Sequence, residues 1–267
     1  MRVLVGGGTG FIGTALIHLL KARGHEVTLV SRKPGPGRIT WDELATSGLP
    51  SCDAAVNLAG ENILNPLRRW NEAFQKEVLS SRLETTQLLA RAITKAPQPP
   101  QAWVLVTGVA YYQPSLTAEY DEDSPGGDFD FFSNLVTRWE AAARLPGDST
   151  RQVVVRSGVV LGRGGGAIGH MLLPFRLGLG GPIGSGQQFF PWIHIGDLHH
   201  RASCLWARAC HHAAGGPEGD PTADTGHWLP VFLPRAGACT EGSHSLSEKV
   251  HGRDHGLALN RGFPGRD

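Results

Sequence analysis

The sequence predicts an α/β protein built on a doubly wound parallel sheet. Apolar segments of strand length alternate with helical patterns in six successive units, which is typical of a parallel sheet covered by helices on both faces. In the first unit, Gly7-x-x-Gly10-x-x-Gly13 stands directly between a strand pattern and a helix pattern. The 267 residues are 40% hydrophobic and 18% charged, which is enough for a full α/β core with a small second lobe.

The glycine turn is the most informative stretch of the chain. Because glycine has no Cβ, the backbone can turn tightly from strand to helix and a ligand can approach it closely. The helix that follows presents unpaired N–H groups and the positive end of its dipole. This combination favours a dinucleotide pyrophosphate, with an ordinary strand-to-helix turn as the alternative. The expected contacts are Gly7, Thr9, Gly10, Phe11, Ile12 and Gly13.

The hydrophobic pattern places the elements. Apolar runs bounded by turn residues predict strands, and apolar residues at three- and four-residue spacing predict helices. In chain order we expect a helix over 11–23, strands over 25–30 and 38–41, a helix over 42–47, a strand within 53–60, a helix over 71–95, a strand over 102–107, a helix over 134–144 and a strand over 152–156. Residues 157–162 then close the cofactor-binding half.

The end of the second strand indicates which dinucleotide binds. An NAD enzyme usually carries an acidic residue about twenty positions after the glycines, where it holds the ribose hydroxyls. Ser31 and Arg32 stand there instead, followed by Lys33. A carboxylate would repel a 2′-phosphate, whereas a guanidinium binds it through charge-assisted hydrogen bonds. The sequence therefore predicts NADP(H), with a solvated basic turn as the alternative.

Two further cofactor contacts follow from position. The strand within 53–60 ends in small residues, and at the carboxyl edge of a parallel sheet such a corner lets a cofactor pass over the backbone. Leu58 and Ala59 are the expected contacts. Arg82 lies in the inward stripe of the 71–95 helix, and a charge that faces a core needs a partner. The cofactor diphosphate is one candidate; a snorkelling side chain or an internal ion pair are the alternatives. The stripe comprises Gln75, Leu79, Arg82, Thr86, Leu89 and Ile93.

Candidate catalytic hydroxyls follow the fifth strand. Thr107 ends that strand, where catalytic hydroxyls of this architecture lie, and Tyr111 and Tyr112 follow on the next loop. The acidic run over 119–130 is most simply a solvated loop.

Composition excludes several classes of protein. The formal net charge of +1 gives no basic excess for nucleic acid or an anionic membrane. No apolar run is long enough to span a bilayer, and the first residues already begin a strand, so we expect neither a membrane span nor a leader peptide. Four cysteines make no disulfide framework, which predicts a reducing compartment, the cytoplasm.

Four stretches together resemble a known family. They are GGGTGFIG over 6–13, VNLAGE over 56–61, residues 75–82, and the long segment 174–195 that ends in WIHI. On these motifs, residues 1 to about 198 resemble the atypical or extended short-chain dehydrogenase/reductase superfamily of the NAD-dependent epimerase/dehydratase type, and within it the epimerase family protein branch.

The resemblance implies a Rossmann domain for NADP(H) over 1–162 and a substrate-lobe segment over 163–198. It also implies that Glu77 and Arg82 contact the cofactor and that the backbone of Val160 lies near the nicotinamide. The assignment of Glu77 rests on the resemblance alone, because periodicity places that side chain on the outer face of its helix.

One expected motif of the superfamily is missing. Its enzymes usually carry Tyr-x-x-x-Lys, in which the lysine lets the tyrosine transfer a proton near neutral pH. None of the three tyrosines here has such a lysine, and no lysine occurs between Lys95 and Lys249. Tyr111 or Tyr112 could act as donor, with Arg138 or the charge of the nicotinamide itself as the nearby cation. Two functions therefore stay open: an oxidoreductase or epimerase for a small carbonyl or sugar-like substrate, and an NADP(H)-binding sensor with little or no turnover.

Residues 199–267 have a different character. They are rich in glycine, proline and histidine and hold no lasting helical or strand period. The substrate lobe is therefore expected to be incomplete, and the tail to be disordered or altered by splicing or reading frame. No metal is expected, because the spacing of the cysteines and histidines over 204–212 fits no usual zinc pattern. A homodimer through helices on the sheet face is a further expectation.

Overall fold

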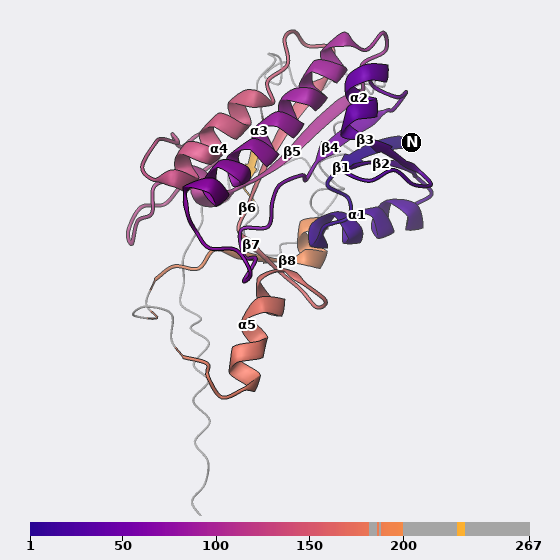
Figure 1. Ribbon diagram of the computed structural model, residues 1–267. Helices are drawn as coiled ribbons and strands as arrows, with labels where there is room; N and C mark the ends of the chain where they lie inside the picture. Colours follow the sequence, from indigo (N-terminus) through magenta and orange to yellow (C-terminus); the bar gives the residue numbers. More distant parts are fainter. Residues whose placement is uncertain (182–185, 187, 200–228, 233–267) are drawn as a thin grey trace, which may run out of the picture.

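The computed structural model of the chain describes residues 1–181, 186, 188–199 and 229–232. Within them a parallel sheet of seven strands runs in the order β3-β2-β1-β4-β5-β6-β9 (Figure 1). The strands are β1 (Arg2–Gly6), β2 (Glu26–Ser31), β3 (Arg38–Thr40), β4 (Ala54–Asn57), β5 (Ala102–Gly108), β6 (Arg151–Ser157) and β9 (Leu229–Phe232). The strand order reverses between β1 and β4, and this switch point is where open α/β sheets bind their ligands. The predicted doubly wound Rossmann sheet is confirmed.

Helices cover both faces of the sheet. Figure 1 shows α1 on one face and α2, α3 and α4 on the other. These helices are α1 (Phe11–Ala22), α2 (Trp41–Ser47), α3 (Glu72–Lys95) and α4 (Phe131–Ala142). The core is correspondingly double, because successive residues of β1 face opposite sides: Val3 and Val5 pack with Leu16 of α1, whereas Leu4 packs with Leu89 of α3. Alternation along buried strands therefore produces the two layers.

Two helices differ in detail from the expectation. The helix expected from residue 134 begins at Phe131, because Asp130 and Ser133 form a reciprocal capping box at its start. In the first half of α3 the fully buried residues are Phe74 and Val78, one position before the expected Gln75 and Leu79. This half of α3 packs against α4, where Phe74 and Val78 form a buried cluster with Leu135 and contact Phe131 and Phe132.

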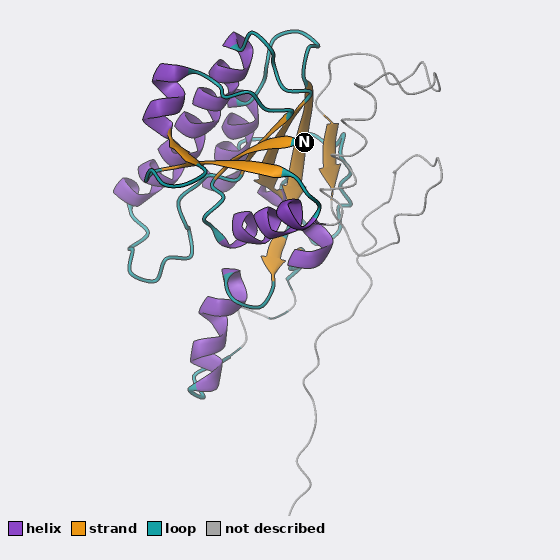
Figure 2. Cartoon of the chain, turned by 90° about the vertical axis from the view of Figure 1, so that its right-hand side faces the viewer, coloured by secondary structure: helices purple, strands orange, loops and turns teal. Residues whose placement is uncertain are grey.

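A small lobe follows the sheet. Strands β7 (Val159–Leu161) and β8 (Trp192–His194) form a separate parallel pair, and α5 (Gly166–Arg176) extends below the layered body in Figure 2. The segment expected to close the cofactor-binding half thus pairs with the lobe, because its strand continues past β6 and meets β8 instead of the main sheet.

Part of the expected tail joins the sheet. Leu229–Phe232 pairs in parallel with β6, with Val154 opposite Pro230, so this segment is a strand rather than an unstructured stretch. The candidate metal ligands over 204–212 lie outside the described residues.

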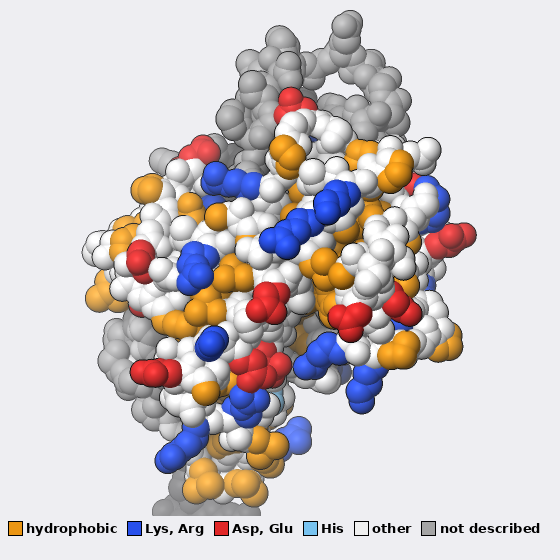
Figure 3. Space-filling view, turned by 45° about the horizontal axis from the view of Figure 1, so that its top comes forward, with side chains coloured by type: hydrophobic (Ala, Val, Ile, Leu, Met, Phe, Trp, Pro, Cys, Tyr) orange, Lys and Arg blue, Asp and Glu red, His pale blue; other side chains and the backbone are white. Residues whose placement is uncertain are grey.

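The surface shows mixed charge. On the face seen in Figure 3, side chains of both signs are interspersed with apolar ones, as a net charge of +1 leads one to expect. Among the described helices, none is both long and apolar enough to cross a bilayer.

Candidate functional site

The glycine turn links the carboxyl end of β1 to α1. Gly7 has a φ of +75°, a left-handed conformation that favours glycine. A Cβ on Gly7 would lie 2.5 Å from the backbone nitrogen of Ala59, and a Cβ on Gly13 would lie 2.5 Å from the carbonyl oxygen of Gly7. Glycine at these two positions therefore lets the turn pack against the β4 corner and against itself. A Cβ on Gly10 would meet only the Gly7 oxygen, at 3.5 Å, so the outer side of the turn is open.

The first turn of α1 is free to receive an anion. Gly10 is the N-cap residue, no side chain of the described chain caps the helix, and the first turn carries no acidic residue. The N–H groups of Phe11, Ile12 and Gly13 at this end are those that a phosphate usually satisfies. The turn thus has the open side, the donors and the dipole that a pyrophosphate requires.

Hydrogen bonds fix the β4 corner beside this turn. The fully buried Asn57 donates from Nδ2 to the Thr86 hydroxyl at 2.8 Å, and its Oδ1 accepts from the Ala59 N–H at 3.0 Å. Trp139 donates to the same hydroxyl at 2.8 Å, while the Leu58 N–H donates to the Gly6 carbonyl at 2.9 Å. Leu58 and Ala59 are therefore held at the switch point. Neither Asn57 nor Thr86 was expected as a supporting residue, although an amide inside an apolar strand is a usable signal.

Basic residues surround the same edge of the sheet. The Arg32 side chain is 88% exposed and lies 3.9 Å from the Glu61 carboxylate, while the Ser31 hydroxyl donates to the Lys33 carbonyl. Arg82 is more enclosed and donates to the carbonyl oxygens of Val78 at 3.1 Å and Glu61 at 3.0 Å.

Arg82 keeps its charge although it is enclosed. Burial lowers its pKa to about 10, and the nearby Glu61 charge opposes that shift, so the side chain is a cation at neutral pH. Its guanidinium carbon lies 5.3 Å from the centroid of the Trp139 ring. A Cβ on Gly60 would approach that carbon to 2.9 Å, so Gly60 leaves the room that Arg82 occupies.

Glu77 and Val160, the two contacts that rest on the resemblance alone, lie on different elements. Glu77 is half-exposed and forms an ion pair with Arg68 across the start of α3. Val160 is buried in the small lobe, where it pairs with Ile193.

One aromatic ring joins the glycine turn to the small lobe. A Cβ on Gly165 or Gly166 would approach the Phe11 ring to 2.8 Å, and one on Gly162 would approach it to 3.1 Å. At the far end of the lobe, the buried His199 ring lies 3.3 Å from the Ile12 carbonyl oxygen. The entry and the exit of the lobe therefore both rest on the first turn of α1.

The candidate catalytic residues meet a buried ion pair that sequence reasoning missed. Arg156 at the end of β6 binds the Glu140 carboxylate through Nε at 2.9 Å and Nη2 at 2.8 Å. The Thr107 hydroxyl donates to the same carboxylate at 3.1 Å, and Arg156 Nη1 donates to the Tyr112 hydroxyl at 2.7 Å. For Arg156, burial opposes the charged form, but the hydrogen bonds and charge of Glu140 outweigh it and raise the pKa.

The two tyrosines differ in their surroundings. Burial raises the pKa of Tyr112 to about 12 in spite of Arg156, so this hydroxyl stays protonated far above neutral pH. The Arg156 guanidinium lies 3.6 Å from the centroid of the Tyr111 ring, and the Tyr111 hydroxyl has no hydrogen-bond partner among the described residues. Arg138 is exposed on α4; the cation beside both tyrosines is Arg156. A lone arginine ending an apolar strand was the signal for it.

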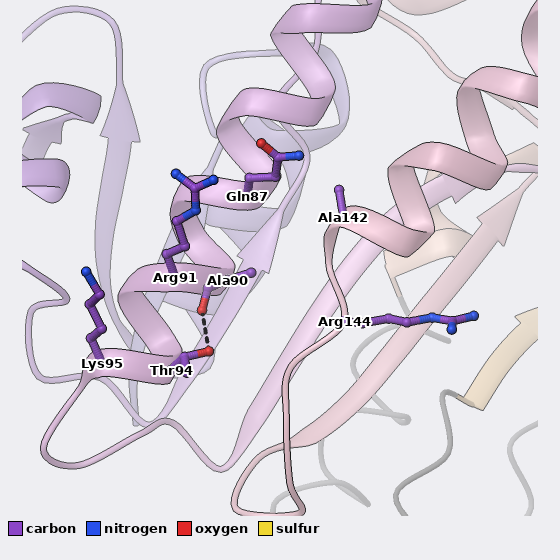
Figure 4. A pocket seen from close by; sticks show the side chains of 7 residues that line it. All are labelled: Gln87, Ala90, Arg91, Thr94, Lys95, Ala142 and Arg144. Carbon is purple, nitrogen blue, oxygen red and sulfur yellow. Dashed lines mark hydrogen bonds between the residues drawn. The ribbon is translucent and has the colours of Figure 1, made fainter.

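A separate hollow of about 220 Å³ lies between α3 and α4 (Figure 4). It is lined by Gln87, Ala90, Arg91, Thr94, Lys95, Ala142 and Arg144. Because both helices end there, ahead of β5 and β6, the hollow lies at the amino edge of the sheet, opposite the glycine turn. In Figure 4 the side chains of Lys95 and Arg144 point away from one another, so its cations do not converge on a ligand. The described residues contain no group of three or more potential metal ligands.

The chain is similar to several known proteins. A profile of the NAD dependent epimerase/dehydratase family matches residues 3–219. The chain is 94% identical to human epimerase family protein SDR39U1 over 198 residues, which cover 74% of this chain and 68% of the human protein. It is 37% identical over 212 residues to the chloroplastic SDR39U1 homolog of Arabidopsis thaliana, covering 74% of this chain and 60% of the plant protein.

Two solved structures are similar as well. The crystal structure of human SDR39U1 with NADPH is 89% identical, with a TM-score of 0.76 over 78% of this chain and 71% of that one. The nucleoside-diphosphate sugar epimerase of Corynebacterium glutamicum is 31% identical, with a TM-score of 0.62 over 79% of this chain and 43% of that one. The chain belongs to the NAD dependent epimerase/dehydratase family.

Proposed function

We propose that the chain binds NADP(H) at the glycine turn and acts as an oxidoreductase or epimerase on a small carbonyl or sugar-like substrate. The observation that carries the proposal is the uncapped start of α1 behind an open glycine turn, with the exposed Arg32 at the end of the neighbouring β2. The similar human protein, solved with NADPH, supports the choice of dinucleotide.

The residues present fit the cofactor. Glycines at 7 and 13 keep the turn tight, and the first-turn amides of α1 would hold the pyrophosphate. Ser31 and Arg32 would hold the 2′-phosphate, Leu58 and Ala59 would lie under the adenosine half, and Arg82 would offset the diphosphate charge. Thr9, Glu77 and Val160 are further proposed contacts. When bound, NADP(H) supplies or accepts the hydride; the protein must orient it and manage the proton.

Tyr111 is the proposed proton donor. Its hydroxyl is not engaged by the described residues, whereas that of Tyr112 accepts a hydrogen bond from Arg156. The role of Tyr112, with Thr107 and Glu140, is then to hold Arg156 against the Tyr111 ring. Arg156 takes no proton itself, because arginine does not deprotonate in proteins.

The second candidate is an NADP(H)-binding sensor. It is favoured by the missing Tyr-x-x-x-Lys, because no lysine that could relay a proton occurs between Lys95 and Lys249. Arg138, the cation expected in place of that lysine, is exposed on α4. A cradle for the dinucleotide is common to both candidates, so binding alone does not separate them.

The test combines binding with turnover. NADPH affinity is measured at equilibrium, and NADPH oxidation is followed across a panel of small carbonyl compounds and nucleotide sugars. Tyr111→Phe should keep NADPH binding and lose at least about 100-fold in turnover, and Tyr120→Phe is the matched control. Tight binding without any turnover would favour the sensor, and full turnover in Tyr111→Phe would exclude that residue as the donor.

A further inference from the structure

Glu61 lies among arginines at the carboxyl edge of the sheet. Its carboxylate is 3.9 Å from Arg32 Nη1, and its side chain is only 18% exposed, whereas that of Arg32 is 88% exposed. The Glu61 charge also favours the charged forms of Arg68 and Arg82. The Glu61 charge therefore acts on three arginines, and among the described residues Arg32 is its ion-pair partner.

The backbone of Glu61 is fixed by α3. Its N–H donates to the Ser81 hydroxyl at 3.0 Å, and its carbonyl oxygen accepts from Arg82 at 3.0 Å. Two adjacent residues of α3, Ser81 and Arg82, therefore anchor the backbone of Glu61 on both sides of its Cα. The backbone of Glu61 is therefore fixed and its side chain is largely enclosed, whereas its partner Arg32 is a long and exposed side chain.

We propose that Glu61 sets the selectivity of the chain between NADP(H) and NAD(H). The inference rests on the proposed binding of NADP(H) through Arg32. In the free protein the Glu61 carboxylate lies 3.9 Å from Arg32, and a 2′-phosphate that reaches Arg32 has to compete with it and meet its like charge. NADH carries a 2′-hydroxyl instead, which a carboxylate accepts as a hydrogen-bond donor. Glu61 therefore weakens NADPH binding and supports NADH binding.

The size of the effect follows from the geometry. The Glu61 carboxylate lies 3.9 Å from Arg32, and the interaction of two unit charges about 4 Å apart at a solvated edge corresponds to roughly a fivefold change in affinity. Glu61→Gln keeps the shape of the side chain and removes its charge. We expect it to tighten NADPH binding about fivefold, with NADH binding unchanged or weaker.

The test measures dissociation constants for NADPH and NADH from nicotinamide fluorescence in the full chain. Glu61→Gln and Glu61→Ala should both raise the ratio of the NADH constant to the NADPH constant by about fivefold or more. Glu84→Gln, which removes an exposed carboxylate from α3, should leave the ratio unchanged. In an Arg32→Gln background the effect of Glu61→Gln should be smaller, because the part that comes from competition for Arg32 is lost and only the repulsion of the 2′-phosphate and the hydrogen bond to the 2′-hydroxyl remain.

Adenosine 2′,5′-bisphosphate and 5′-AMP, used as competitors, repeat the measurement without the nicotinamide half. NADPH binding with the same ratio in wild type and both Glu61 variants would overturn this inference and leave the proposed function intact. A lower ratio in the variants would also overturn it, since Glu61 would then favour NADPH over NADH in the wild-type protein. Wild-type protein that binds neither dinucleotide would refute the proposed function and this inference together.

Discussion

Replacement of Glu140 by glutamine should destabilise the protein more than any comparable change at its surface. The Glu140 carboxylate receives two hydrogen bonds from Arg156, at 2.9 and 2.8 Å, and one from Thr107 at 3.1 Å. The side chains of Arg156 and Glu140 are only 7% and 11% exposed, so solvent barely screens the pair. Glu140→Gln leaves a buried guanidinium without its counter-charge, which costs about 3–5 kcal/mol.

The expected loss is large enough for simple assays. For a chain of this size, about 3–5 kcal/mol corresponds to a drop of roughly 6–20 °C in melting temperature, measured by circular dichroism and checked by urea unfolding. Glu77→Gln is the matched control: its partner is Arg68, and both side chains are more than 40% exposed, so about 1 kcal/mol or less is expected. Equal, small effects of the two substitutions would refute the claim that the Glu140 pair is a buried and coupled unit.

Two other predictions concern the turn and the buried tyrosine. Gly7→Ala should abolish NADPH binding, because φ is +75° and the new Cβ would lie 2.5 Å from the Ala59 nitrogen; Gly24→Ala, with φ +76° but open space around it, should lose about 1 kcal/mol of stability and bind normally. Equal binding by both variants in equilibrium titrations would contradict this account of the turn. Burial raises the pKa of Tyr112 from 10.0 to about 12, so the unfolded chain loses that proton first. Its contribution to the free energy of unfolding is intact below about pH 10 and falls by about 1.4 kcal/mol per pH unit up to about pH 12. Urea unfolding of wild type and Tyr112→Phe over that range checks this, and identical pH slopes would count against it.

Local patterns were sufficient for most of the fold. Strands such as Ala54–Asn57 and Ala102–Gly108 are apolar and short, as strands buried on both faces must be, and the glycine turn fixes the first strand-to-helix crossing. The start of one helix was predicted less well. The helix at Phe131 was expected three residues later, although Asp130 and Ser133 carry the spacing of a cap.

The missed parts of the candidate site depend on contacts between distant residues. Arg156 finds Glu140 on the preceding helix, and Asn57 finds Thr86 on α3. Each of these residues is visible in the sequence as a polar group in an apolar run, but its partner is set by how α3 and α4 pack on the sheet. The same holds for β9, a four-residue segment whose pairing with β6 no local period announces.

The contact between Phe11 and the glycines at 162, 165 and 166 limits how the small lobe can be exchanged. A lobe grafted from a relative would have to bring an entry segment with glycines at these three places, or the ring would clash with each new Cβ. Conversely, a host whose first helical residue is not aromatic would leave that entry segment without its support. The lobe is therefore a transferable unit only together with the residue that begins α1, some 150 positions earlier in the chain.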